Sequence, residues 1–331
     1  MISPSSERLI SILERMRRVR ALVVGDVMLD TYLRGAVSRV SPEAPVPIVH
    51  VTEEFHAPGG AANVAANVAA LGATCDLVGL IGRDLAGLEL EQLLGRMGIA
   101  SDGLLRTDDR PTTVKTRVMA GHHQVARYDR ESVDDVNAAV AAELVALIER
   151  FAATADVIVV EDYDKGVMAR PVIDAVASLG RSLDRPVVVD PKARHFFDYG
   201  GCTVLKPNRV ELAAAMRAPV PADDNDAMES IRRRLGCANL LVTLGEQGMV
   251  LVPEGGEVLR VPSTARSVFD VSGAGDTVVA VVALALAAGA TVEEAAVLAN
   301  FAAGLGVAKS GVATVGPEEL AESIRSTAVY A

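Results

Sequence analysis

The sequence contains no tryptophan, and only 3% of its 331 residues are aromatic. A core rich in large aromatic side chains is therefore excluded, although half of the residues are hydrophobic. The core must consist mainly of alanine, valine and leucine, which suits a parallel sheet covered by helices. The length is sufficient for one large domain or two ordinary ones, and for a substantial core.

Cysteine is also scarce: Cys75, Cys202 and Cys237 lie far apart, and there is no Cys-x-x-Cys pair. This pattern indicates neither a disulfide framework nor a zinc site, so we expect buried thiols in a reducing compartment. Residues 1–20 lack the apolar core of a signal peptide. The longest apolar run, 278–290, is too short to span a bilayer. We expect a cytoplasmic protein without a membrane partner.

Excess positive charge is absent as well, because the formal net charge is −11. Such a chain lacks the basic surface of a nucleic-acid-binding protein. Anionic ligands must then be held by local basic groups and by helix N-termini. No Gly-x-Gly-x-x-Gly follows the first predicted strand, which argues against a dehydrogenase, and the histidines show no metal-ligand spacing.

Apolar runs of strand length alternate with alanine-rich helical segments over most of the chain. The predicted strands are 21–24, 76–81, 157–160, 187–189 and 240–243. The predicted helices include 61–71, 85–97, 136–152 and 172–183. Runs of β-branched residues separated by helices predict an α/β fold with a doubly wound, mostly parallel sheet.

Two segments interrupt this alternation. Residues 31–54 contain three prolines and a strand-like run, and residues 112–130 resemble two strands joined by a turn. We predict that both segments form a small β-lid at the edge of the sheet. The expected organisation is a single domain over 1–331, with lid segments at about 31–56 and 105–131.

The strongest chemical motif is Asp270-Val-Ser-Gly-Ala-Gly-Asp276, directly before a predicted apolar helix. Glycines at a helix start allow a ligand to approach, and the free N–H groups there form an anion hole. Phosphoryl transfer needs such a hole, because charge spreads over the oxygens of the moving group. Asp276 would accept the proton of an attacking hydroxyl from the first helical turn. A glycine turn with Asp276 as a helix cap is the alternative.

A second glycine-rich turn, Pro58-Gly-Gly-Ala-Ala-Asn-Val64, also precedes a predicted helix, where Asn63 would bond to ligand hydroxyls. Asp26 and Asp30 follow the first predicted strand. In an open α/β sheet, ligands bind beyond the carboxyl ends of the strands. Asp26 is therefore either a sugar contact or an ordinary turn residue.

Asn208 and Glu211 stand three residues apart at a predicted helix start. The pair either orients Mg²⁺ through water or forms a helix capping box. The run Thr243-Leu-Gly-Glu-Gln-Gly248 lies between two strand candidates. It either holds nucleotide phosphates or forms a hairpin turn.

Together and in this order, these motifs resemble those of the ribokinase (PfkB) family of carbohydrate kinases, over nearly the whole chain. More narrowly, residues 25–30, 37–47 and 162–166 resemble the members that act on D-glycero-D-manno-heptose 7-phosphate. That resemblance implies ATP-dependent phosphorylation of O1, which yields the 1,7-bisphosphate used for nucleotide-activated heptose and the lipopolysaccharide core. Glu161 departs from the resemblance, which leads us to expect a small residue there.

The resemblance implies roles around the phosphoryl group and the nucleotide. Asp276 would be the catalytic base, and the anion hole would consist of Gly273, Ala274 and Gly275. The remaining residues on this side would be Asn208 and Glu211 for Mg²⁺ through water, Thr243, Gly245 and Gly248 for the nucleotide, Asn300 near the adenine, and carbonyls around Asp270 and Gly311 for a monovalent cation such as K⁺.

The resemblance also implies which residues bind the sugar phosphate. The resemblance implies that Asp30, Gly59, Gly60 and Asn63 bind the sugar, and we expect Asp162 and Asp190 among the substrate contacts. A 7-phosphate requires cations, and the candidates are Lys115, Arg117 and Arg127 in the predicted lid together with Lys165, Lys192 and Arg194. For any one of these cations, a surface salt bridge is the alternative.

Three hypotheses result: a kinase for the heptose phosphate, a kinase of the same fold for fructose 1-phosphate, ribose or a nucleoside, and a non-catalytic sugar-binding regulator. The intact Asp276 and its glycines argue against the third, because a binding protein needs no base beside an anion hole. The lids of relatives pair, so the resemblance implies a homodimer.

Overall fold

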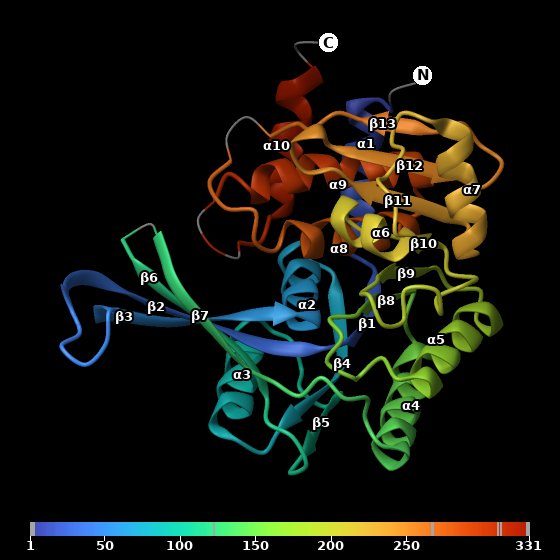
Figure 1. Ribbon diagram of the computed structural model, residues 1–331. Helices are drawn as coiled ribbons and strands as arrows, with labels where there is room; N and C mark the ends of the chain where they lie inside the picture. The colour runs from blue at the N-terminus through green and yellow to red at the C-terminus, as the bar shows by residue number, and fades with distance from the viewer. Residues whose placement is uncertain (1–3, 122, 266–267, 310, 312, 329–331) are drawn as a thin grey trace.

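The computed structural model describes residues 4–121, 123–265, 268–309, 311 and 313–328. Within these residues the central sheet has the strand order β13-β12-β11-β10-β9-β8-β1-β4-β5 (Figure 1). Its strands are β1 (Arg20–Gly25), β4 (Thr74–Gly82), β5 (Leu104–Thr107), β8 (Val157–Glu161), β9 (Val187–Asp190), β10 (Val204–Leu205), β11 (Asn239–Thr243), β12 (Met249–Pro253) and β13 (Leu259–Val261). Only β12 runs antiparallel to its neighbours in this described sheet. The predicted α/β, mostly parallel architecture is confirmed.

Helices cover both faces of this sheet. One face carries α1 (Ser6–Met16), α2 (Ala61–Ala70), α3 (Leu85–Arg96), α8 (Ala274–Ala287), α9 (Val292–Gly306) and α10 (Pro317–Ala328). The other face carries α4 (Ala138–Ala152), α5 (Arg170–Ser182), α6 (Arg209–Met216) and α7 (Asn225–Leu235). None of these described helices combines the length and the hydropathy that a bilayer crossing requires.

Strand β1 shows how the sequence produces this arrangement. Ala21 and Val23 belong to the core on one face of the sheet, and Leu22 and Val24 belong to the core on the other. Successive side chains of a strand point to opposite faces, so a strand covered on both sides must be apolar throughout. The near-continuous apolar runs therefore predicted the covered sheet correctly.

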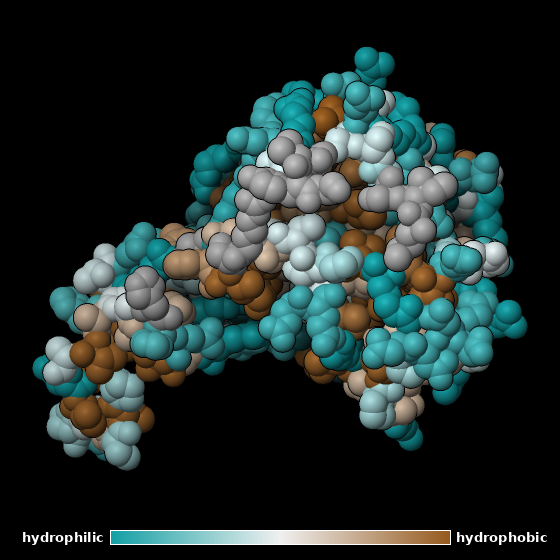
Figure 2. All heavy atoms as spheres, turned by 90° about the horizontal axis from the view of Figure 1, so that it is seen from above, coloured by the Kyte–Doolittle hydropathy of each residue, from teal (hydrophilic) through white to brown (hydrophobic). Residues whose placement is uncertain are grey.

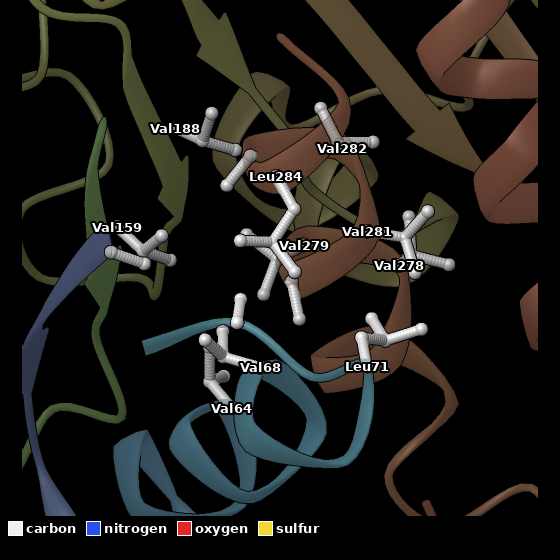
Figure 3. Packing of buried hydrophobic residues seen from close by; sticks show 14 of the residues in the cluster. Val64, Val68, Leu71, Val159, Val188, Val278, Val279, Val281, Val282 and Leu284 are labelled. Carbon is white, nitrogen blue, oxygen red and sulfur yellow. The ribbon is translucent and has the colours of Figure 1, made fainter. Parts of the chain in front are cut away.

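Helix α8 is buried along most of its length, from Asp276 to Ala285. Figure 3 shows Val279 of α8 between the strands that carry Val159 and Val188 and the helix α2 that carries Val68. Each fully buried valine contributes about 1.5–3 kcal/mol to stability. This packing fixes the N-terminal turn of α8 beside the carboxyl ends of β8 and β9.

A second sheet projects from one side of the molecule, with the strand order β3-β2-β6-β7 (Figure 1). Its strands are β2 (Val27–Val40), β3 (Pro47–Gly60), β6 (Thr113–Ala120) and β7 (His123–Arg130). We call it the lid sheet. The predicted lid segments thus pair with each other, and β2 and β6 join them in parallel. The boundary predicted at about 105 was wrong, because β5 pairs with β4 in the central sheet. A strand of four residues is too short to give a clear pattern in the sequence.

Asp26 ties the loop after β8 to the end of β1. Its Oδ2 accepts the N–H of Tyr163 at 2.8 Å and that of Lys165 at 3.0 Å, and its Oδ1 accepts the N–H of Val167 at 3.1 Å. Burial raises the pKa of Asp26, and these three N–H groups oppose the rise. Of the two interpretations of Asp26, the structure therefore favours the turn residue.

Replacing Asp26 with asparagine leaves N–H donors of this loop facing an amide group instead of a carboxylate. We expect the free energy of unfolding at neutral pH to fall by about 2–4 kcal/mol, since buried donors lose their acceptor. Urea denaturation measures this change. Asp174→Asn is the matched control, because Asp174 is an exposed partner of Arg170 on α5, and its loss should cost about 0.5 kcal/mol or less. Equal, small losses in both variants would contradict the structural role of Asp26.

Candidate active site

Charged side chains gather where the parallel strands end and α8 begins. Glu161 and Asp190 are the last residues of β8 and β9, and Lys206 directly follows β10. Asp276 lies in the first turn of α8. All four are buried, although charged residues are seldom buried without partners. This cluster marks the carboxyl edge of the sheet, which is where open α/β sheets bind their ligands.

Asp276 is held from two directions. Its Oδ2 accepts a hydrogen bond from the Asn63 side-chain amide at 2.5 Å, and its Oδ1 accepts one from the Tyr163 hydroxyl at 3.3 Å. Burial raises the pKa of Asp276 to about 6, and the hydrogen bond from Asn63 opposes that rise. A carboxylate with such a pKa is ionised at neutral pH and can still accept a proton.

The glycine turn lies directly beside Asp276. Gly273 precedes α8 with φ near +78°, a conformation that favours glycine. A Cβ added at Gly275 would lie 3.4 Å from Nζ of Lys206. The positive end of the α8 dipole and the Lys206 ammonium therefore act on the same small region, which includes Ala274 at the first helical position. This arrangement suits an anionic ligand.

A polar network joins α2 to α8 beneath this turn. Asn67 donates to the Asn63 backbone carbonyl at 2.9 Å, and the hydroxyl of Thr277 donates to the Asn67 side chain at 2.9 Å. We expected Asn63 to bond to sugar hydroxyls, but in the structure its amide nitrogen donates to Asp276. Asn67 was missed, although a second asparagine four residues later on an otherwise apolar helix is a signal for a buried network.

Lys206 is a further residue that the sequence interpretation left without a role. Its Nζ lies 2.7 Å from Oδ2 of Asp190, and both side chains are buried. Burial lowers the pKa of Lys206, but Asp190 and Glu161 reverse this and raise it. Lys206 is therefore a buried cation next to the glycine turn. A lysine at a strand end, in a run otherwise apolar, was the available signal.

Tyr163 connects Asp276 to two cations. Its ring lies 4.5 Å from Nζ of Lys115 and 4.8 Å from Nζ of Lys192. The Asp276 carboxylate and burial raise the pKa of Tyr163, so its hydroxyl stays protonated and donates. The sequence interpretation used Tyr163 only as part of a resemblance. The structure places it between the predicted base and the predicted phosphate-binding cations.

Asp30 lies on the lid side of the site. Its Oδ2 pairs with Arg117 at 3.1 Å, whereas its buried Oδ1 has no hydrogen-bond partner among the described residues. A Cβ at Gly59 would lie 3.2 Å from that Oδ1. Gly59 thus leaves room beside Asp30, and Gly60, with φ near +55°, begins the turn into α2. Asp30 has the free acceptor that a sugar contact requires.

The predicted phosphate-binding cations differ in whether they already form an ion pair with a carboxylate. Lys115 is buried and forms no ion pair among the described residues, and burial lowers its pKa while Asp30 raises it. The other lid-side cations each pair with a carboxylate: Arg127 with Asp129, Lys165 with Glu131, and Arg194 with Asp135. Lys115 is therefore the cation that is most available to an anion.

Asn208 and Glu211 form a capping box at the start of α6. Asn208 Oδ1 accepts the Glu211 N–H at 2.9 Å, and Glu211 Oε2 accepts the Asn208 N–H at 2.8 Å. The other oxygen of Glu211 pairs with Lys192. Burial lowers the pKa of Lys192, but Asp190 and Glu211 more than reverse this and raise it. The capping interpretation is thus confirmed, and Lys192 is engaged by Glu211.

The Thr243–Gly248 run lies next to this box. Thr243 bridges Asn208 in parallel at the ends of β11 and β10. Gly245 begins a short 3-10 turn that leads into the antiparallel strand β12, so the run forms a hairpin turn. At Gly248 a Cβ would lie 2.0 Å from the Val261 carbonyl oxygen, which explains why glycine is required there.

Asn300 and the Asp270 loop lie on the α9 side. The Asn300 amide donates to the Pro262 carbonyl at 2.7 Å, so this nitrogen holds the loop before α8. Asp270 accepts the N–H of Ser272 at 2.9 Å and that of Gly311 at 3.2 Å. The structure therefore brings Asp270 and Gly311 together, as the expected cation site requires.

Asp162 does not reach this region with a free oxygen. Oδ2 accepts the Tyr199 hydroxyl at 2.7 Å, and Oδ1 accepts the N–H of Asp164 at 2.8 Å. Burial raises the pKa of Asp162 to about 6, with Asp26 as a further cause. In contrast to our expectation of a substrate contact, one of its oxygens is used by its own loop and the other by Tyr199, which lies between β9 and β10.

Comparisons with known proteins agree with this geometry. A family model described as "pfkB family carbohydrate kinase" matches residues 19–319. The chain is 47% identical over 309 residues to the bifunctional protein HldE of Azorhizobium caulinodans, which covers 92% of the chain and 64% of that protein. The protein of the same name in Rhodospirillum rubrum is 43% identical over 325 residues, with coverage of 98% and 66%. The chain thus spans slightly less than two thirds of these relatives.

Solved structures show the same fold. Ribokinase of Arabidopsis thaliana, complexed with ribose and ATP, superposes with a TM-score of 0.74 at 21% identity, covering 93% of this chain and 99% of that one. Phosphofructokinase-2 of Escherichia coli, in complex with potassium, gives 0.75 at 20% identity, with coverage of 94% and 99%. The fold is therefore ribokinase-like. Because the family match extends over most of its length, the chain belongs to the pfkB family of carbohydrate kinases and is a kinase.

Proposed function

We propose that this kinase transfers the terminal phosphoryl group of ATP to O1 of D-glycero-β-D-manno-heptose 7-phosphate, forming the 1,7-bisphosphate of ADP-heptose and lipopolysaccharide core biosynthesis. The observation that carries the transfer is the buried Asp276 carboxylate beside the glycine turn of α8. The choice of the heptose rests on the resemblance of residues 25–30, 37–47 and 162–166.

Asp276 would act as the general base. The O1 proton passes to its carboxylate while O1 forms a bond to phosphorus and the bond to the departing ADP oxygen breaks. Asn63 and Tyr163 hold the carboxylate in place, and orientation of this kind is a large part of catalysis. The N–H groups of residues 273–275 and the Lys206 ammonium would stabilise the charge of the transferred group.

The sugar phosphate would lie between Asp276 and the lid sheet. Asp30 offers a free buried oxygen to a sugar hydroxyl, and a side chain at position 59 in place of Gly59 would crowd this oxygen. Gly60, at the turn into α2, would be a further sugar contact. Lys115 would bind the 7-phosphate first, because it has no ion pair among the described residues to break. Other proposed contacts, which would exchange an existing partner for the substrate, are Arg117, Arg127, Lys165 and Lys192. Asp190 is also proposed as a substrate contact, since its Oδ1 has no hydrogen-bond partner among the described residues.

The nucleotide would contact Thr243, Gly245, Gly248 and Asn300. Bound Mg²⁺ would neutralise part of the charge on the nucleotide phosphates, and Asn208 and Glu211 would hold it through water. Because carboxylate and amide oxygens suit Mg²⁺, the donors fit, although both Glu211 oxygens already have protein partners. K⁺ would bind near carbonyls of the Asp270 and Gly311 loops.

We also propose a homodimer formed through the lid sheet, within the cytoplasm. Figure 2 shows apolar side chains gathered on this projecting part of the molecule. The exposed apolar residues there are Val37, Val40, Val46, Val51, Val125 and Tyr128. Contiguous exposed apolar surface of this kind commonly marks an interface. The three cysteines are free and buried, which suits a reducing compartment.

Asp276→Asn tests the proposed base. The substitution keeps the shape of the side chain but replaces one of the two acceptor oxygens, which Asn63 and Tyr163 use, with an NH2 group. It also removes proton acceptance, so we expect kcat to fall about 10²- to 10⁴-fold. ATP binding, measured by calorimetry, should change less than about threefold, because the nucleotide does not need the base. Asp223→Asn is the control, since Asp223 is fully exposed, lies near Arg260 of β13 and is not among the residues that we assign to a ligand. A near-normal rate in the Asp276 variant would rule out its role.

The pH dependence of kcat/KM gives a second test. Asp276 has a pKa raised to about 6 and acts only when ionised. The rate should therefore be full above this pKa and fall about tenfold per unit as the pH drops below it. A rate that stays constant down to about pH 5 would show that Asp276 does not limit it. Activity regained on return to neutral pH separates titration from acid unfolding.

A substrate panel measured by ADP release tests the identity of the sugar. We expect heptose 7-phosphate to exceed ribose and a nucleoside in kcat/KM by at least about tenfold, since the cationic cluster favours a phosphorylated sugar. A similar preference over fructose 1-phosphate is expected from the resemblance of residues 25–30, 37–47 and 162–166. Lys115→Met should raise KM for the phosphorylated sugar more than for its unphosphorylated form. Preference for ribose or fructose 1-phosphate would overturn the assignment while leaving the kinase activity intact.

A further inference from the structure

Glu161 is the residue at which the sequence departs from the resemblance, and its environment is unusual. It ends β8, is completely buried, and lies opposite Asp190 in the register of β8 and β9. Carboxylate oxygens of Glu161, Asp190 and Asp276 lie within 4.8 Å of one another. Three carboxylates thus share one buried space at the carboxyl edge of the sheet.

The oxygens of this cluster are not equally engaged. Both Asp276 oxygens accept hydrogen bonds, from Asn63 and Tyr163, and Oδ2 of Asp190 pairs with Lys206. Among the described residues, both oxygens of Glu161 and Oδ1 of Asp190 have no hydrogen-bond partner. Buried polar atoms without partners are rare in proteins and call for a ligand, a water or an ion. The free acceptors therefore belong to Glu161 and Asp190.

The charges do not balance either. The cluster holds three carboxylates, and Lys206 supplies the only ammonium that pairs with them in the part of the chain that the structure describes. Lys192, the next cation, pairs with Glu211. Burying unpaired negative charge costs several kcal/mol per ion, so the cluster needs either a proton or a cation. Free carboxylate oxygens are the ligands that hard divalent cations prefer.

We infer that Glu161 and Asp190 form a divalent-cation site that binds Mg²⁺ or Mn²⁺ without nucleotide. The free oxygens of Glu161 and Asp190 would be the protein ligands, and waters would complete the shell. Asp276 would keep its bonds to Asn63 and Tyr163 and stay available as a base. The site is separate from the Asn208–Glu211 pair, which is satisfied internally.

The role of this cation rests on the proposed function. Gly275 of the anion hole lies next to Asp190, since a Cβ added there would be 3.7 Å from Asp190 Oδ2. A cation at this position adds positive charge beside the transferred phosphoryl group before the nucleotide arrives. The binding itself depends only on Glu161 and Asp190, so it can be tested without substrate or ATP.

Binding of Mn²⁺ to the purified, nucleotide-free chain is measured by loss of the free Mn²⁺ signal in electron paramagnetic resonance, with Mg²⁺ as competitor. We expect one site in the native protein. Glu161→Gln, which keeps the shape of the side chain, should weaken Mn²⁺ binding at least about tenfold, and Glu161→Ala should do the same. Glu91→Gln is the matched control, because Glu91 of α3 pairs with Arg106 of β5, and its replacement should leave Mn²⁺ binding unchanged.

Several outcomes would overturn the inference. Absence of Mn²⁺ binding in the native chain would show that the cluster holds a shared proton. Native-like binding in Glu161→Gln, or loss in Glu211→Gln while Glu161→Gln still binds, would place the ion elsewhere. Thermal unfolding of each variant checks its fold. Mn²⁺ binding that depends on Glu161, in a protein that fails to phosphorylate the heptose, would support this site and refute only the proposed function.

Discussion

Asp276 is buried at the start of a helix whose other buried positions are apolar apart from Thr277. A carboxylate there can stay ionised only with support from its surroundings. The α8 N-terminus, the Asn63 amide and the Tyr163 hydroxyl provide that support from three different parts of the chain. Burial nevertheless raises its pKa to about 6. The apolar packing of α8 against α2, β8 and β9 stabilises the fold. By burying Asp276, the same packing also raises the pKa of the proposed base.

Asn63 and Tyr163, which hold the Asp276 carboxylate, are themselves held in place by other residues. Asn63 is held by Asn67, which Thr277 of α8 anchors in turn. Tyr163 stands in a loop whose backbone is bound by Asp26 at the end of β1. The oxygens of two buried carboxylates near the site, Asp26 and Asp162, are thus used within the protein, by the backbone of this loop and, for Asp162, also by the Tyr199 hydroxyl. This explains why a conspicuous aspartate in the sequence was a poor guide to a sugar contact.

The lid sheet joins this centre through charge. Arg117 pairs with Asp30 across neighbouring parallel strands, and Lys115 lies over the ring of Tyr163. Lys115 is buried without an ion pair among the described residues, which costs free energy unless an anion binds. The proposed phosphate contact and the Glu161–Asp190 cluster therefore have the same physical basis. Each buries excess charge of one sign, and a ligand of the opposite charge, a phosphate or a cation, would neutralise it.

The sequence by itself determined whatever depends on near neighbours in the chain. Apolar runs predicted the covered sheet, the glycine turn predicted the start of α8, and the spacing of Asn208 and Glu211 allowed the capping box that is observed. It could not show which side chains meet across long stretches of chain. Asn63 lies 213 residues from Asp276, and Tyr163 lies 113 residues from it. Only the tertiary structure decided that Asn63 faces Asp276 and that Lys206 pairs with Asp190. It also decided that Glu161 has no hydrogen-bond partner within the described ranges. The reason is physical: hydrogen bonds and ion pairs depend on distances in space, which the packing of helices on the sheet sets and local spacing does not.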